Sequence, residues 1–286
     1  MPRVICAGHL NWDVTLRVDS LPDPDGEVPV TDRRAGGGGS AGNVATGLAD
    51  LGLDVALLGS VGDDEEGRRA REELTDAGVD ASHVVTAPDL PTTRKYIVVD
   101  SSGEVMVLGC DGANETFEAS DLPESSLADA EHLHLTSQDP ETAARLAERA
   151  KAHGLTVSFD PGRRIGDRGY GPAISAVEYL FLNDREAALA LDAFDLTEQT
   201  LVLKRGPEGA EIRDGERVAH PGYPIDVVDT TGAGDAFAAG FIAALVDGAD
   251  RERALAVANA CGALVSQAPG ARTSLTWDDV DAFIGE

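Results

Sequence analysis

The chain has 286 residues, 42% of them hydrophobic, which is enough to bury the core of one large α/β domain or of two modest ones. Its formal net charge is −28, from 51 acidic and 23 basic side chains, and its only lysines are Lys95, Lys151 and Lys204. Such a surface repels nucleic acid and anionic lipid, so we expect neither as a partner. The acidic excess favours a halophilic protein, because molar salt shortens the Debye length to about 3 Å and screens the self-repulsion.

The cysteines and the hydropathy pattern favour a cytoplasmic location. Cys6, Cys110 and Cys261 stand singly, so they predict neither a disulfide framework nor a zinc site, and we expect them to be buried small hydrophobic residues. No signal-peptide pattern is present, and no apolar run approaches the roughly 18 residues of a membrane span. We therefore expect a cytoplasmic protein.

The first part of the chain predicts alternating strands and helices. The helix after the glycine-rich stretch is indicated by Val44, Leu48 and Leu51, which recur at helical spacing. In chain order we expect a strand that continues into a second one, a loop, that helix, a buried strand and a charged surface helix, at residues 3–18, 32–42, 43–52, 54–62 and 66–78.

Residues 94–110 interrupt this alternation with a hairpin. Two β-rich runs flank Ser101, Ser102 and Gly103, which is a typical hairpin turn. A hairpin inside an α/β pattern indicates a small sheet outside the main one. We expect it to form a lid, built from about residues 14–34 and 94–110.

The second part of the chain resumes the alternation. Asp139 and Pro140 are typical of a helix start, since one can cap the helix and the other fits its first position. Strands are expected at 132–136, 155–160, 179–183, 201–206, within 211–222 and ending at 227–228, and helices at 140–154, 235–247, 252–267 and 276–285. The pattern predicts an α/β fold for residues 1–286 as a single domain, with a doubly wound, mostly parallel sheet flanked by helices and a small β-sheet lid.

Residues 227–241, VVDTTGAGDAFAAGF, are the most informative stretch. Gly232, Ala233 and Gly234 form a tight turn at the start of a helix, where unpaired N–H groups and the helix dipole favour an anion. Asp235 lies at the same place, and a carboxylate beside an anion site is suited to accept the proton of a substrate hydroxyl. This combination favours phosphoryl transfer. A plain capped helix is the alternative.

The glycine-rich stretch admits two interpretations. Gly37, Gly39 and Gly42 fit the G-x-G-x-x-G pattern of a dinucleotide site, and Asp63 is the ambiguous candidate for its acidic partner. However, that pattern should follow a buried strand, whereas residues 29–35 are polar and charged. Glycine also lets the backbone approach a compact polyol.

Several stretches of the chain together resemble a known family. Residues 229–241 closely resemble the C-terminal signature of the ribokinase-like, or PfkB, sugar kinases, and residues 35–52 resemble their N-terminal signature. The stretches GSVGDDEEG, CDGAN, FLNDREA and LVLKRGPEGA follow in the family's order, so the resemblance covers essentially the whole chain. It implies a ribokinase-like fold and an ATP-dependent, magnesium-requiring kinase that acts on a primary hydroxyl of a small sugar.

The resemblance also implies roles for individual residues. Asp235 would be the general base, and Gly232, Ala233 and Gly234 would be the anion hole. The sugar-binding residues would be Asn11, Asp13, Gly38, Gly39 and Asn43. On the ATP side, Asn183 and Glu186 would organise Mg²⁺ and phosphate through water, with Lys204, Gly206, Gly209 and Asn259 lining the nucleotide site. A monovalent cation such as K⁺ would lie at Asp229, Thr231 and Ser274.

Some features leave alternatives open. Ser137 or Gln138 stands where ribokinase has a glutamate for the sugar, and residues 159–164, FDPGRR, lack an asparagine of some relatives. A nucleoside kinase of the same family is therefore a close alternative. An NAD-dependent oxidoreductase and a non-catalytic sugar-binding regulator are more remote ones. Because relatives pair through the lid, we expect a homodimer.

Overall fold

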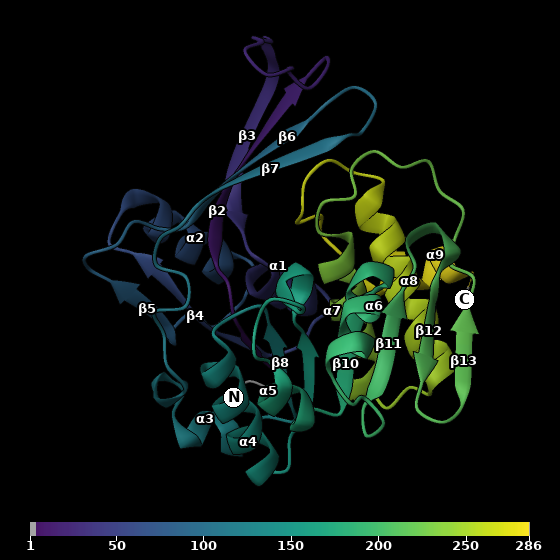
Figure 1. The fold of residues 1–286 in the computed structure, drawn as a ribbon. Coiled ribbons are helices and arrows are strands. Elements are labelled where there is room, and N and C mark those ends of the chain that lie inside the picture. Colours follow the sequence, from purple (N-terminus) through teal and green to yellow (C-terminus); the bar gives the residue numbers. More distant parts are fainter. Residues whose placement is uncertain (1–3, 286) are drawn as a thin grey trace.

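A nine-stranded sheet runs through residues 4–285, the part of the chain that this computed structural model describes (Figure 1). Its order is β13-β12-β11-β10-β9-β8-β1-β4-β5, and the strands from β11 to β5 pair in parallel, whereas β12 and β13 form an antiparallel hairpin at one edge. The strands are β1 (Val4–Ala7), β4 (Val55–Gly62), β5 (Val84–Ala87), β8 (His132–Thr136), β9 (Thr156–Asp160), β10 (Tyr179–Asn183), β11 (Thr200–Lys204), β12 (Ala210–Arg213) and β13 (Arg217–His220).

Helices cover both faces of this sheet and create two hydrophobic cores. In β1, Val4 and Cys6 pack into one core while Ile5 and Ala7 pack into the other, because successive strand residues point to opposite faces. The first core contains residues of α1 (Ser40–Asp50), α2 (Glu65–Asp76), α7 (Ala233–Val246), α8 (Arg251–Ser266) and α9 (Trp277–Ile284). The second contains residues of α3 (Glu124–Ala128), α4 (Pro140–Ala152), α5 (Gly171–Ser175) and α6 (Asp184–Ala193). The expected doubly wound α/β architecture is thereby confirmed.

A separate four-stranded sheet, here called the lid sheet, projects beyond the main sheet (Figure 1). Its order is β3-β2-β6-β7, with β2 (Asn11–Val18), β3 (Val30–Gly38), β6 (Arg94–Val99) and β7 (Val105–Cys110). The expected loop at 32–42 is wrong for residues 32–38, which lie in β3, and for 40–42, which begin α1. Residues 32–38 belong to this lid sheet. They form an antiparallel ladder with β2, from Asn11 opposite Gly38 to Val18 opposite Val30, and this long-range pairing overrides their weak strand propensity.

Three local expectations are also corrected. Val227 and Val228 do not end a strand, since they are 60% and 50% exposed and pair with no strand among the described residues. Helix α7 begins at Ala233, so the Gly-Ala-Gly turn runs into its first turn. Cys110 lies exposed on β7, whereas Cys6 and Cys261 are buried as expected.

The predicted helix caps are confirmed at two places. The Asp139 carboxylate accepts from the Thr142 N–H, with Pro140 in the first turn of α4, and Thr276 caps α9. Within residues 4–285, no helix combines the length and the apolar character needed to cross a membrane.

Candidate active site

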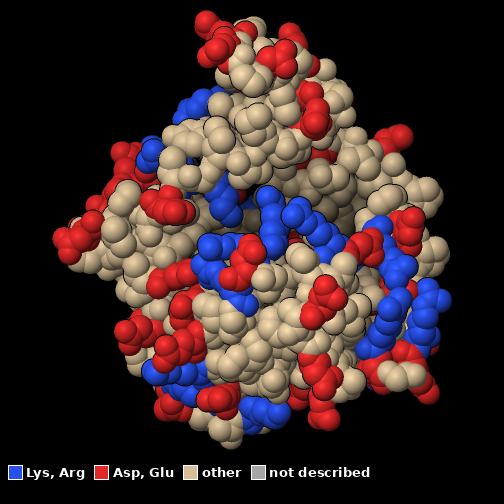
Figure 2. Space-filling view, viewed as in Figure 1, with Lys and Arg blue, Asp and Glu red and all other residues tan. Residues whose placement is uncertain are grey.

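The carboxyl ends of the parallel strands open toward the underside of the lid sheet. In Figure 2, Lys and Arg side chains gather around the hollow between the lid sheet and the body, while Asp and Glu are scattered over the rest of this face. A basic hollow is unexpected on a chain of net charge −28. It indicates that the cleft receives an anionic ligand, since a cleft lined with one sign of charge concentrates its counter-ions.

The start of α7 forms an anion-binding turn at this cleft. Gly232 adopts the left-handed conformation at φ 78°, and a Cβ there would lie 2.4 Å from the Ala271 carbonyl oxygen, so only glycine fits. No acceptor among the described residues takes the N–H groups of Gly234 or Asp235. These two donors, at the positive end of a helix of 14 residues, can receive a phosphoryl oxygen.

Asp235 lies in the first turn of α7 and contacts the first turn of α1. The Asn43 side-chain amide donates to Asp235 Oδ2 over 2.8 Å, which joins the two signature stretches across 192 residues of chain. Burial raises the pKa of Asp235 to about 6, and the charge of Asp160 adds to this, while the Asn43 hydrogen bond and Lys204 act in the opposite direction. A carboxylate tuned in this way is suited to accept a proton near neutral pH.

Arg272 organises the glycine-rich stretch, and the sequence analysis did not single it out. Its Nε donates to Asn43 Oδ1 over 3.0 Å, and its Nη2 lies 3.3 Å from the Gly38 carbonyl oxygen. A Cβ on Gly37 or Gly42 would lie 2.6 Å from a guanidinium nitrogen of Arg272. Two of the three glycines of the G-x-G-x-x-G pattern therefore make room for this arginine rather than for a pyrophosphate.

The residues expected to bind the sugar lie together beside Asp235. A Cβ on Gly38 would lie 2.0 Å from Asp13 Oδ2, and Gly39, at φ 86°, packs against the His9 carbonyl. Asn11 is fully buried, yet its amide nitrogen has no hydrogen-bond partner, and neither has Asp13 Oδ1. Burial raises the pKa of Asp13, which the charges of Lys95 and Arg272 partly offset. Unsatisfied buried polar atoms of this kind are expected where a polyol binds.

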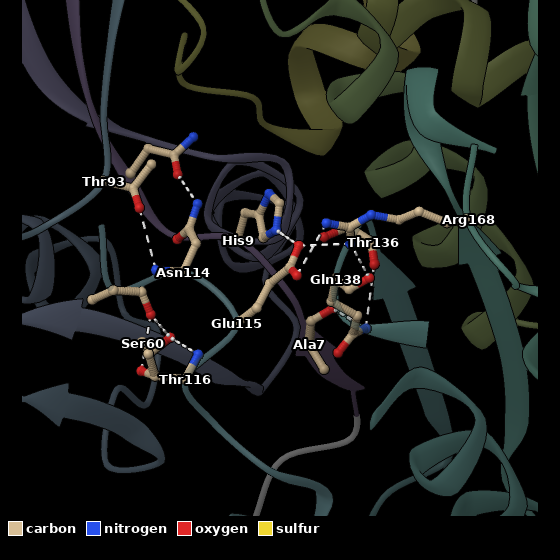
Figure 3. A network of polar contacts seen from close by, with 12 residues as sticks. Ala7, His9, Ser60, Thr93, Asn114, Glu115, Thr116, Thr136, Gln138 and Arg168 are labelled. Carbon is tan, nitrogen blue, oxygen red and sulfur yellow. Dashed lines mark hydrogen bonds and ion pairs between the residues drawn. The ribbon is translucent and has the colours of Figure 1, made fainter. Parts of the chain in front are cut away.

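A polar network that the sequence analysis did not anticipate forms the floor of this part of the cleft (Figure 3). The Arg168 guanidinium donates hydrogen bonds to both carboxylate oxygens of Glu115, over 2.8 and 3.1 Å, and His9 Nε2 lies 2.8 Å from Glu115 Oε1. Glu115 has φ 67°, and although burial raises the pKa of its carboxyl, the hydrogen bonds and charges of His9 and Arg168 outweigh this and lower the pKa to about 2. The adjacent Asn114 amide donates to Asn11 Oδ1 over 2.5 Å. Arg168 and His9 thus fix the loop that positions Asn11.

The ends of strands β9 and β11 meet near the start of α7. Lys204, ending β11, lies 2.5 Å from Asp160 Oδ2, ending β9, and its Nζ would be 3.7 Å from a Cβ on Gly234. Burial alone would lower the pKa of Lys204, but the charges of Asp160 and Glu186 outweigh it and raise the pKa. A protonated lysine therefore sits beside the anion-binding turn, where a phosphate would meet it.

Asn183 and Glu186 form the cap of α6 at the edge of this group. The Asn183 side chain accepts from the Glu186 N–H, and the Glu186 carboxylate accepts from the Asn183 N–H, both over 2.9 Å. Glu186 is nevertheless only 4% exposed, and burial together with the Asp160 charge raises its pKa. The two residues therefore cap the helix start, and the charges of Asp160 and Lys204 act on Glu186.

Other expected nucleotide residues have mainly structural contacts. A Cβ on Gly209, at φ 85°, would overlap the His220 carbonyl oxygen, so the turn before β12 requires glycine. Gly206 begins the 3-10 turn η3 (Gly206–Glu208) and is exposed. The Asn259 amide donates to the Leu255 carbonyl one turn back along α8, as in an ordinary buried helix position.

The residues expected to bind a monovalent cation already have other contacts or lie exposed. Asp229 accepts from the Thr231 and Gly270 N–H groups at 2.9 and 3.0 Å, and the Arg17 guanidinium lies 3.8 Å from it. Ser274 is exposed, and no hydrogen bond joins it to Asp229 in the described part of the chain. Within residues 4–285, no cluster of three or more His, Cys, Asp or Glu side chains could hold a metal ion by itself.

The remote dinucleotide interpretation fails on this geometry. A dinucleotide site needs a parallel strand, a glycine turn and a helix in one unit. Here Gly37 lies within β3, an antiparallel strand of the lid sheet, Gly39 and Gly42 come after it, and Asp63 is exposed beyond the end of β4.

Comparison with known proteins identifies the relatives of the chain. The family model described as pfkB family carbohydrate kinase matches residues 1–278. An ATP-dependent ribose-1-phosphate kinase from Halopiger xanaduensis is 52% identical over all of this chain and 99% of its own length. A nucleoside kinase from Methanothermobacter thermautotrophicus is 29% identical, over 95% of this chain and 92% of its own. The crystal structure of a nucleoside kinase from Methanocaldococcus jannaschii superposes with a TM-score of 0.86 at 27% identity, covering 100% of this chain and 98% of that one.

Proposed function

The chain belongs to the pfkB family of carbohydrate kinases, and we propose that it transfers the terminal phosphoryl group of ATP to the 5-hydroxyl of ribose 1-phosphate. The relative that shares 52% of its residues over the full length is an ATP-dependent ribose-1-phosphate kinase. The 5-hydroxyl is the one primary hydroxyl of that sugar phosphate. The observation that carries the proposal is Asp235, held by Asn43 beside the free N–H groups of the α7 start.

The proposed reaction is a direct displacement at phosphorus. Asp235 takes the proton of the 5-hydroxyl while the oxygen attacks the terminal phosphorus, and the bond from that phosphorus to ADP breaks. The N–H groups of Gly234 and Asp235 donate hydrogen bonds to the oxygens of the transferring phosphoryl group and stabilise their negative charge. Lys204 neutralises negative charge on the departing ADP. Asn11, Asp13 and the glycine pair Gly38 and Gly39 would orient the sugar hydroxyls.

Magnesium fits the cleft, because Mg²⁺ keeps several waters and needs few protein ligands. Asp160, Asn183 and Glu186 would hold it, since carboxylate and amide oxygens suit Mg²⁺; burial and then the Asp160 charge raise the pKa of Glu186. When bound, Mg²⁺ would neutralise the phosphate oxygens of ATP. Potassium fits less well, because N–H donors and the Arg17 guanidinium already surround the Asp229 carboxylate.

A nucleoside kinase is the second candidate. The two archaeal nucleoside kinases align over nearly the whole chain, and a nucleoside presents the same ribose 5-hydroxyl. The two activities differ in the group at C1 of the ribose, which is an anion in one case and a flat base in the other. The 52% identical relative, an ATP-dependent ribose-1-phosphate kinase, favours the anion.

We also propose that two copies pair through β7. All six residues of this edge strand are exposed, although it carries Val105, Met106, Val107 and Leu108. An exposed apolar edge strand is prone to pair with another chain. Pairing would cover this edge and leave the cleft open.

A substrate panel tests the proposed function. Purified protein is incubated with ATP, Mg²⁺ and one of ribose 1-phosphate, ribose, cytidine, adenosine or fructose, and ADP release is measured. We expect the highest kcat/KM with ribose 1-phosphate and an Asp235→Asn variant slower by at least about a thousandfold in kcat. A nucleoside as the best substrate, or an Asp235→Asn variant with nearly full activity, would overturn the proposal.

A further inference from the structure

Lys95 is a half-buried cation on the cleft side of the lid sheet. In the parallel ladder between β2 and β6, Lys95 lies directly beside Asp13, so their side chains share one face of the sheet. The opposite face packs against α2, where Arg94 pairs with Glu66. The charge of Lys95 lowers the pKa of Asp13, which agrees with the two side chains being close.

Lys95 has no ion pair and no hydrogen bond to any described residue, although acidic side chains outnumber basic ones 51 to 23. The other two lysines differ from it: Lys204 is paired with Asp160, and Lys151 is exposed on α4. A lysine that is partly withdrawn from water without a partner costs free energy unless a ligand supplies the anion.

There is room for an anion beside Lys95. Its neighbour on β7 is Gly109, and a Cβ built there would meet nothing within 4 Å. The next residues along this face of β6, Ile97 and Val99, are buried and apolar, so Lys95 is the one cation on this face of the strand. The position is open, and Asn11, two residues before Asp13 on β2, has a buried amide nitrogen without a partner.

The geometry of a ribose ring connects this position to the substrate. In the furanose ring C1 and C4 flank the ring oxygen and C5 hangs from C4, so with the 5-hydroxyl at Asp235 the substituent at C1 lies at the other end of the sugar from that carboxylate. Asp13 and Asn11 mark the wall where the ring hydroxyls would bind, and Lys95 lies beside them. Arg168 is not available for this task, because Glu115, the Gln138 carbonyl and the Tyr170 hydroxyl already occupy its Nη1 and Nη2 groups.

We infer that Lys95 binds the phosphate at C1 of the sugar and thereby selects a sugar 1-phosphate over a nucleoside. This inference rests on the proposed function of the cleft. A base at C1 would instead bring an uncharged, flat group against an unpaired ammonium, which loses its water without gaining an anion. Lys95 is thus a specificity-determining residue and takes no part in the phosphoryl transfer itself.

The test compares Lys95→Gln and Lys95→Arg with the wild type, and Lys151→Gln serves as the matched control for loss of a lysine charge. With ribose 1-phosphate, Lys95→Gln should raise KM by about 10–100-fold with kcat changed less than about threefold, because a charged hydrogen bond to the substrate is lost. Lys95→Arg should restore most of the affinity. For ribose, which lacks the phosphate, KM should stay within about threefold of the wild type.

Binding without turnover gives a second readout. In an Asp235→Asn background, calorimetric titration with ribose 1-phosphate should show the same 10–100-fold loss of affinity when Lys95→Gln is added. An unchanged affinity, or an equal loss for ribose and for ribose 1-phosphate, would overturn the role of Lys95 while leaving the proposed function intact. A wild-type protein that neither binds nor phosphorylates ribose 1-phosphate would instead overturn the proposed function.

Discussion

Arg17 on lid strand β2 lies 3.8 Å from the Asp229 carboxylate, which belongs to the loop before α7. The side chain of Asp229 is only 5% exposed, so this contact spans the cleft in a partly desolvated place. It brings the lid sheet to the loop that carries the anion-binding turn. The guanidinium also occupies the surroundings in which a monovalent cation was expected.

Potassium should therefore have little effect on the wild-type enzyme. Exchanging KCl for NaCl at equal ionic strength should change kcat/KM by less than about twofold, because Arg17 already balances the charge of Asp229. Arg17→Gln removes that balance, so this variant should become more active in KCl than in NaCl. A wild type that requires K⁺ would show that Asp229 binds the ion despite Arg17.

The pH profile should report the ionisation of Asp235. A general base must be deprotonated, and its pKa of about 6 lies above the ordinary range. We expect kcat/KM to fall about tenfold per pH unit below pH 6 and to level off above it. Asn43→Ala removes a hydrogen bond that lowers this pKa, so its acid limb should move to higher pH. Lys151→Gln, far from the cleft on α4, should leave the limb in place.

Asp235→Asn should stabilise the fold while it abolishes activity. The folded-state pKa of about 6 exceeds the unfolded value of about 3.9, so the wild type loses stability as the pH rises from about 4 to about 6. Above pH 6 the full cost of the buried charge is present, about 1–2 kcal/mol after allowance for partial exposure. Urea unfolding at pH 7 should show the variant as more stable, with the difference vanishing near pH 4. A less stable variant at pH 7 would contradict this.

The β7 edge should determine the oligomeric state. Val107→Lys combined with Leu108→Lys places two charges on the exposed apolar edge, and like charges on facing copies would oppose pairing. Sedimentation velocity should show a dimer for the wild type and a monomer for this variant. Leu191→Lys on α6, another leucine that is exposed, is the control and should remain dimeric. A monomeric wild type would refute the pairing.

Salt should stabilise the protein more than it stabilises a neutral one. A net charge of −28 repels itself at low ionic strength, and molar salt shortens the screening length to about 3 Å. Raising KCl from 0.1 M to 2 M at pH 7 should increase Tm by several degrees or more. A Tm that is independent of salt would show that the acidic excess is not an adaptation to salt.

The local sequence was enough to predict most of the helices and strands and the anion-binding turn, and the lysine content is read from it directly. The buried strands, the capped helices at Asp139 and Thr276, and the left-handed Gly232 depend on neighbours in the chain, so spacing and residue type suffice to predict them. The strand at residues 30–38 was missed because its stability comes from pairing with β2 rather than from its own composition.

Tertiary structure alone decided which side chains meet. Asn43 reaches Asp235 across 192 residues, and Arg272 reaches Asn43 across 229. The register of β6 on β2, which no local pattern encodes, places Lys95 beside Asp13. These contacts follow from the order in which parallel strands pair and from the closing of long loops, both of which are decided by packing over the whole molecule.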